Sequence, residues 1–141
     1  MKAARTRMRP PTEPNDRSPF KSHGGLRRIV RAAGYSWAGF KAALRHEAAF
    51  RQELALGLPL LLAAPWVGRS VAEALLLAGS VVAVWVVELL NSALEALADE
   101  IALDRRERLG RAKDLGSAAV MLALLMALAA WGAVVAGRLL G

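Results

Sequence analysis

The chain contains no cysteine, which excludes disulfide bridges and thiolate metal sites. It has only two histidines, so the ligands that zinc prefers are scarce. Aromatic residues make up 6% of the sequence and follow no RNA-binding pattern, which argues against a nucleic-acid partner despite a net charge of +7. Neither a Walker phosphate loop nor a kinase glycine-rich loop is present. No apolar segment follows the basic N-terminus, so no signal peptide is expected.

Long apolar runs dominate the remaining sequence. Hydrophobic residues make up 55% of the 141 residues, and the mean hydropathy is +0.33. The charged residues gather in blocks between the apolar runs, a pattern typical of a small membrane protein that spans the bilayer several times. The sequence therefore predicts an all-α membrane protein.

The N-terminal region divides into a tail and a helix. Residues 1–24 carry four prolines among basic and polar residues and are expected to form a flexible tail, whereas residues 25–141 form the membrane domain. Residues 26–45 predict an amphipathic helix that lies in the membrane interface, with basic side chains near the lipid phosphates. Its apolar face consists of Leu26, Ile29, Val30, Ala33, Trp37, Phe40 and Leu44. Its other face carries Arg27, Arg28, Arg31, Tyr35, Lys41 and Arg45.

Three membrane-spanning helices are expected after this helix. They cover residues 48–67, residues 70–90 with an extension to about 100, and residues 116–137. Residues 100–113 are expected to form a short charged connection. Because the N-terminal segment and this connection are rich in Lys and Arg, both are predicted to be cytoplasmic, and the C-terminus is predicted to lie outside.

An acidic stripe emerges from the second apolar run. Glu88, Asn91, Glu95 and Asp99 recur at helical spacing and fall on one face of a continuous helix. Such a stripe is costly next to lipid unless it meets a cation, a proton or water. Glu47 and Glu53, with which the first span begins, are expected at the same depth. Carboxylates from two helices therefore converge at the cytoplasmic interface.

Hard oxygen ligands of this kind favour Mg²⁺, and Mg²⁺ at a cytoplasmic surface favours a nucleotide phosphate, with Lys113 as a countercharge. A lipid alcohol would present its hydroxyl at the same level, where a buried carboxylate can accept the proton. These residues alone predict an interfacial magnesium site that serves a lipid transferase.

The sequence resembles the bacterial diacylglycerol kinase family of small integral-membrane enzymes, densely over residues 28–117. The resemblance rests on four separated blocks, which are Ala32-Ala-Gly-Tyr35-Ser-Trp37, Glu47-Ala-Ala-Phe-Arg-Gln-Glu53, Val87-Glu88-Leu-Leu-Asn91-Ser-Ala-Leu-Glu95 with Asp99, and Gly110-Arg-Ala-Lys-Asp-Leu-Gly-Ser117-Ala-Ala-Val120. It implies an enzyme of the bacterial inner membrane that uses ATP and Mg²⁺ to convert diacylglycerol to phosphatidic acid. The implied fold is an interfacial helix plus three transmembrane helices, assembled as a homotrimer with shared sites.

The resemblance also implies roles for individual residues. Glu88 would be the general base, assisted by Asn91, and Glu47 and Glu95 would hold the metal. The implied nucleotide contacts are Arg28, Tyr35, Glu47, Glu95, Lys113 and Asp114. The implied lipid contacts are Ala33, Ser36, Trp37, Glu53, Glu88 and Ser117.

Other interpretations remain open at this point. The same chemistry can act on undecaprenol, which also presents a primary hydroxyl. A small proton-coupled transporter would use Glu88 as an intramembrane carboxylate. A structural membrane anchor would leave the aligned carboxylates without a purpose. Glu53 can alternatively be an ion partner of Arg51 or Lys113. Residues 103–109 match the family poorly, which leaves nucleotide contacts in that loop open.

Overall fold

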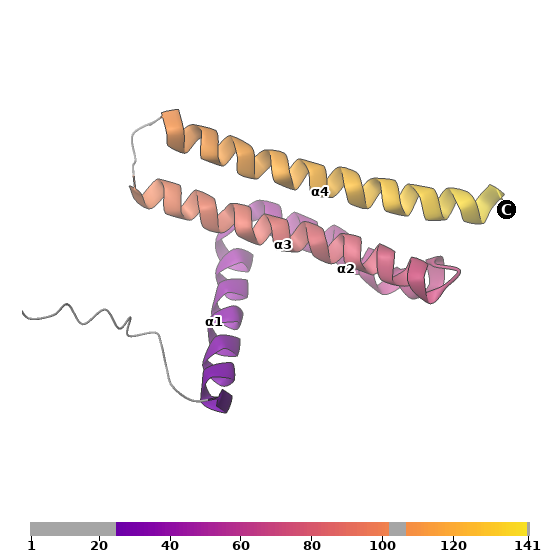
Figure 1. Ribbon diagram of the computed structural model, residues 1–141, viewed down its shortest axis with the longest axis horizontal. Coiled ribbons are helices and arrows are strands. Elements are labelled where there is room, and N and C mark those ends of the chain that lie inside the picture. The colour runs from indigo at the N-terminus through magenta and orange to yellow at the C-terminus, as the bar shows by residue number, and fades with distance from the viewer. Residues whose placement is uncertain (1–24, 102–106, 141) are drawn as a thin grey trace, which may run out of the picture. The chain divides into compact units, whose positions relative to one another are not determined.

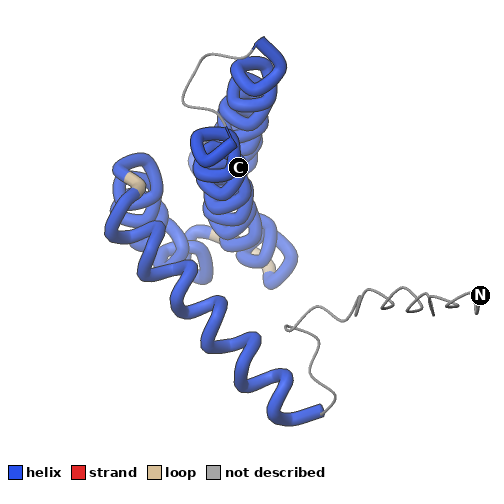
Figure 2. The backbone as a smooth tube through the Cα atoms, turned by 90° about the vertical axis from the view of Figure 1, so that its left-hand side faces the viewer, coloured by secondary structure: helices blue, strands red, loops and turns tan. Residues whose placement is uncertain are grey.

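The structure, a computed structural model, describes residues 25–101 and 107–140. These residues form four helices, α1 (Gly25–His46), α2 (Ala48–Val67), α3 (Val71–Ile101) and α4 (Glu107–Leu140), and they contain no strand (Figures 1 and 2). The all-α prediction is confirmed. The predicted tail over residues 1–24 lies outside the described residues.

The chain divides after Ser36 into two units, each of which is described by itself. In the first unit, the N-terminal part of α1 exposes its apolar and its basic side chains alike, with Ile29 and Val30 among the exposed residues. The Ser36 hydroxyl donates a hydrogen bond to the Ala32 carbonyl oxygen (3.1 Å), so this polar side chain finds its partner within its own helix. Placement of α1 in a membrane interface stays a prediction.

The second unit begins at Trp37, within α1, and includes the corner between α1 and α2. Glu47 interrupts the helices with extended backbone angles (φ −100°, ψ 110°). The rings of Phe40 and Phe50 meet edge to face across the corner, with their centroids 5.9 Å apart. Arg51 Nη1 donates to the carbonyl oxygens of Leu44 (3.3 Å) and Arg45 (3.4 Å), which lack helical partners at the end of α1. Glu47 is thus fixed at the corner by its neighbours.

Helix α3 is the centre of the second unit, because it packs against both α2 and α4 (Figure 1). Ala64 of α2, Leu77 of α3 and Val134 of α4 form a common buried cluster. Most other large apolar side chains of α3 and α4 are exposed, including Leu75, Leu122 and Met126. An exposed apolar surface of this extent is typical of helices that face lipid.

Two helices, α3 and α4, are long and apolar enough to cross a membrane, with peak mean hydropathies of 2.0 and 2.4. Only 28% and 11% of the most apolar 18-residue segments of α3 and α4 are buried within the protein, which distinguishes these helices from the core helices of a soluble domain. Helix α2 does not meet the same criterion. It carries Arg51 and Glu53 near its start and contains Pro59 and Pro65. The span expected over residues 48–67 therefore stays a prediction.

The expected connection over residues 100–113 is shorter in the structure, because α3 continues to Ile101 and α4 begins at Glu107. Glu107 suits the first turn of a helix, where its charge faces the positive end of the helix dipole. It also pairs with Arg111 one turn later (3.2 Å). Charge alone was thus a poor indicator of a loop here.

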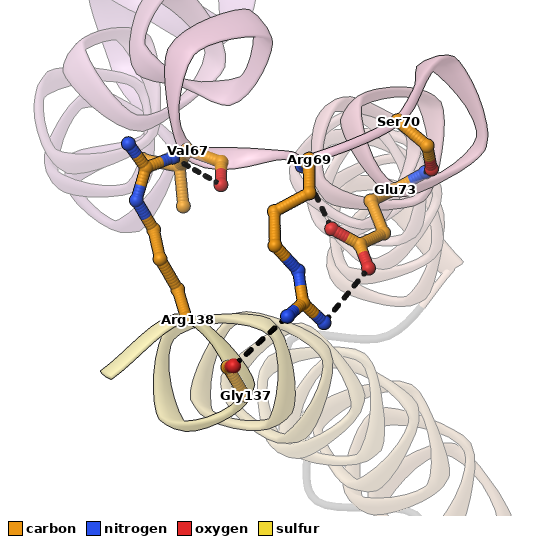
Figure 3. Close-up of polar contacts among 6 residues, drawn as sticks. All are labelled: Val67, Arg69, Ser70, Glu73, Gly137 and Arg138. Atoms are coloured by element: carbon orange, nitrogen blue, oxygen red, sulfur yellow. Dashed lines mark hydrogen bonds and ion pairs between the residues drawn. The ribbon is translucent and has the colours of Figure 1, made fainter. Parts of the chain in front are cut away.

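Two arginines link α4 to the end of α2 and to the α2–α3 turn (Figure 3). Arg69, in the turn between α2 and α3, donates from Nη1 to the Gly137 carbonyl oxygen of α4 (2.9 Å). Arg138 donates in the opposite direction, from Nη1 to the carbonyl oxygens of Trp66 (2.6 Å) and Val67 (3.0 Å) at the end of α2. Each arginine therefore satisfies helix-terminal carbonyl groups of another helix. We refer to Arg69 and Arg138 together as the arginine clamp.

Candidate functional site

The acidic stripe lies on a single helix, α3, as predicted. Glu88 is buried, with 3% of its surface exposed, whereas Asp99 near the helix end is exposed. No residue within 25–101 or 107–140 forms an ion pair with Glu88. A buried carboxylate without a cation is costly, so its retention points to a chemical role.

Three further carboxylates surround Glu88. Glu95 lies two turns further along α3, and Glu47 lies at the α1–α2 corner. Both carboxylates are close enough for their charges to repel that of Glu88. Glu53 of α2 is similarly close to Glu88, and its Oε2 atom is buried without a hydrogen-bond partner among the described residues. The structure therefore brings Glu47 and Glu53 near Glu88 of the stripe. We refer to Glu47, Glu53, Glu88 and Glu95 as the carboxylate group.

Asn91 connects this group to α4. Its Nδ2 donates to Glu95 Oε1 (3.2 Å), which fixes one oxygen of that carboxylate. Its Oδ1 is buried without a partner among the described residues and lies against Gly116 of α4. Any Cβ atom at position 116 would collide with the Asn91 side chain. Glycine at this position therefore makes room for the amide that holds Glu95.

Lys113 pairs with Asp99 across α3 and α4, with Nζ donating to Oδ1 at 3.0 Å. This hydrogen bond raises the pKa of the Lys113 ammonium, which lies before the apolar part of α4 and stays charged at neutral pH. Lys113 is also close enough to Glu95 to be attracted by its charge. Among the described residues, neither Arg51 nor Lys113 forms an ion pair with Glu53, because Arg51 donates to backbone carbonyls and Lys113 to Asp99.

The carboxylate group fits magnesium only in part. Its donors are all oxygen atoms, which Mg²⁺ prefers, and Asn91, whose Nδ2 holds Glu95, has an Oδ1 atom without a partner among the described residues. Within the described ranges, no three acidic or histidine side chains come close enough to hold a metal ion together. The described residues therefore suit a metal ion whose remaining ligands come from elsewhere, as the oxygens of a nucleotide phosphate would.

The remaining predicted site residues are exposed side chains. Asp114 and Ser117 are exposed on α4, and Trp37 is exposed on α1 with the Lys41 ammonium 5.6 Å from its ring centroid. The others are exposed residues of the first unit, namely Arg28, Ala33, Tyr35 and Ser36. Residues 104–106, within the loop whose nucleotide contacts were left open, lie outside the described residues.

The sequence analysis missed three residues that shape the surroundings of the carboxylate group. Trp85 of α3 donates from Nε1 to the Glu53 carbonyl oxygen of α2 (3.2 Å), and Gly57 makes room for its indole ring. Gly116 makes room for Asn91. Helical spacing offered a signal for two of them, because Trp85 precedes Glu88 by one turn and Gly57 follows Glu53 by one turn.

Comparison with known proteins places this geometry in a family. A family model described as prokaryotic diacylglycerol kinase matches residues 34–135. The diacylglycerol kinase of Escherichia coli (strain K12) is 48% identical over 107 residues, which cover 76% of this chain and 88% of that protein. The diacylglycerol kinase of Pseudomonas aeruginosa is 44% identical over 120 residues, covering 85% of this chain and 98% of the relative. That of Haemophilus influenzae is 40% identical over 110 residues, or 78% of this chain and 93% of the relative. On these matches and on its helical architecture, the chain belongs to the prokaryotic diacylglycerol kinase family.

Proposed function

We propose that this protein is a lipid kinase that transfers the γ-phosphoryl group of ATP to the primary hydroxyl of diacylglycerol and forms phosphatidic acid. The observation that carries the proposal is the burial of Glu88, which forms no ion pair with a described residue, on a helix whose apolar surface suits lipid. The names of the relatives at 40% to 48% identity support the same acceptor.

Glu88 is the general base of the proposed reaction. Its carboxylate accepts the proton of the lipid hydroxyl while the hydroxyl oxygen forms a bond to the γ-phosphorus. The bond from that phosphorus to the oxygen bridging the β- and γ-phosphates breaks, and ADP leaves. Asn91 is a positioning residue in this scheme, because it holds one oxygen of Glu95.

Glu47 and Glu95 are the residues that would hold magnesium, with ATP supplying the remaining oxygen ligands. When bound, the metal ion neutralises charge that develops on the transferred group. Lys113 faces the same phosphates, and its pairing with Asp99 keeps the ammonium in place. Asp114, Arg28 and Tyr35 complete the proposed nucleotide contacts.

On the lipid side, Glu53 lies between the base and the apolar interior of the second unit. Ser117, Trp37, Ser36 and Ala33 are the further proposed contacts. Membrane interfaces favour aromatic and polar side chains of this kind, so Trp37 can serve both as an anchor and as a contact.

The protein is proposed to reside in the bacterial inner membrane, with α2 as a third span, α1 in the interface and three copies sharing their sites. The basic N-terminal segment favours a cytoplasmic N-terminus and an external C-terminus. That orientation places the carboxylate group on the side where ATP is available.

Replacement of Glu95 by Gln is expected to raise the magnesium concentration needed for half-maximal activity about tenfold or more, since one of two carboxylate ligands is lost. The measurement is a magnesium titration of the purified enzyme at saturating lipid. Glu107→Gln, on an exposed glutamate at the start of α4, is the matched control and should leave the titration unchanged. An unchanged titration in Glu95→Gln would remove Glu95 from the metal site.

The function itself is tested by incubating the purified protein in mixed micelles with γ-labelled ATP and either diacylglycerol or undecaprenol. Label is expected in phosphatidic acid. Label in undecaprenyl phosphate instead would keep the chemistry and change the acceptor. Label in neither lipid would reject the kinase.

A further inference from the structure

An apolar cavity of about 360 Å³ lies within the second unit and is lined by side chains of α2, α3 and α4. Among the described residues, Glu53 is its only charged lining residue, and the Oε2 atom of Glu53 is buried without a described partner. Glu53 in turn is close to Glu88, the proposed base. From Glu53 to Leu60 the cavity follows α2 for about 10 Å, at the rise of an α-helix.

Trp85 lies in the wall of this cavity, directly against Gly57. Its indole N–H is held by the Glu53 carbonyl oxygen (3.2 Å), so the ring has one defined position. A Cβ atom at Gly57 would lie 2.9 Å from indole atoms Cζ2 and Nε1 and 2.9 Å from Val81 Cγ1. The ring therefore depends on glycine at position 57 to stay against α2 and out of the cavity.

We infer that the cavity receives an acyl chain of the lipid acceptor and that Trp85, seated against Gly57, determines which chains fit; this inference rests on the proposed function. The cavity offers apolar walls to the chain, and its one carboxylate lies at the end next to the base. A lipid alcohol has the same distribution of polarity, because it carries a hydroxyl at one end of an apolar chain. The chain would enter while its hydroxyl stays beside Glu88.

The size of the indole ring is what makes Trp85 a specificity-determining residue. Trp85→Leu removes much of the ring and enlarges the cavity, which favours long or bent chains. Gly57→Ala forces the ring toward the cavity, which disfavours them. A pocket that gains or loses space for a few methylene groups typically discriminates about 10- to 200-fold between substrates.

The test compares dioctanoylglycerol with dioleoylglycerol as acceptors in mixed micelles. Trp85→Leu is expected to raise the ratio of kcat/KM for the long chain over the short chain about tenfold, through KM and with little change in kcat. Gly57→Ala is expected to lower the same ratio about tenfold. Combined with Trp85→Leu, the Gly57→Ala change should lose most of its effect, since the two positions act on each other.

Two controls separate this effect from a general change in the helices. Trp66→Leu removes an exposed tryptophan of α2 (74% exposed), and Gly79→Ala adds a methyl group where nothing lies within 4 Å. Both should keep the wild-type ratio. Size-exclusion chromatography in detergent reports the oligomeric state of each variant.

Unchanged ratios in active Trp85→Leu and Gly57→Ala enzymes would overturn the inference and leave the kinase function standing. A changed oligomeric state with an unchanged ratio would also overturn it, because a second copy of the chain would then fill the cavity. If the wild-type protein phosphorylates neither diacylglycerol, the proposed function itself has failed.

Discussion

Glu88→Gln is expected to lower kcat about 100- to 10,000-fold, the usual contribution of a general base. Glutamine has the same shape as glutamate but cannot accept the proton of the lipid hydroxyl. Because the side chain is buried and forms no ion pair with a described residue, the substitution should disturb the fold little. The measurement is transfer of label from ATP to diacylglycerol at saturating concentrations of both substrates.

Glu100→Gln provides the matched control, because Glu100 is an exposed glutamate on the same helix. It should retain wild-type kcat. Binding of ATP and the oligomeric state should be the same in both variants and in the wild type. Activity close to wild type in Glu88→Gln would assign the role of the base to another group.

Gly116→Ala is expected to lower activity about tenfold or more, although glycine 116 has no side chain to contribute. The added methyl group would displace Asn91, and over-packing of this kind commonly costs 1 to 3 kcal/mol. Displacement of Asn91 breaks its hydrogen bond to Glu95 (3.2 Å), so the magnesium requirement should rise as well. A magnesium titration of the variant reports both effects.

The control is Gly132→Ala on the same helix, where nothing lies within 4 Å of the added atom, and its activity should stay within about twofold of wild type. In an Asn91→Ala background, Gly116→Ala should cause little further loss, because the side chain with which it collides is gone. Equal losses in both backgrounds would show that Gly116 acts independently of Asn91.

The sequence supplied the helices and the stripe because both follow from helical periodicity. Glu88, Asn91 and Glu95 share a face of any continuous helix, whatever packs against it. The extent of α4 was harder to predict, since the Glu107–Arg111 pair stabilises helix in a segment that looks like a charged loop.

Contacts between helices could not be predicted, because they depend on how one helix is rotated and shifted against its neighbour. Lys113 meets Asp99 and not Glu53, a choice set by the packing of α3 on α4. The seat of Trp85 on Gly57 likewise requires the packing of α2 on α3. Periodicity within one segment carries no information about such pairings.

The arginine clamp has a consequence for the lipid environment. It fixes one end of α3 near Ser70, and Glu88 lies about 27 Å further along the same helix, at about 1.5 Å per residue. If the clamp stays among the headgroups of one leaflet, this fixed length places the base, Glu88, among the headgroups of the opposite leaflet. Phospholipids with much longer or much shorter tails would shift the base away from the acceptor hydroxyl, or strain the protein and the surrounding lipid through hydrophobic mismatch.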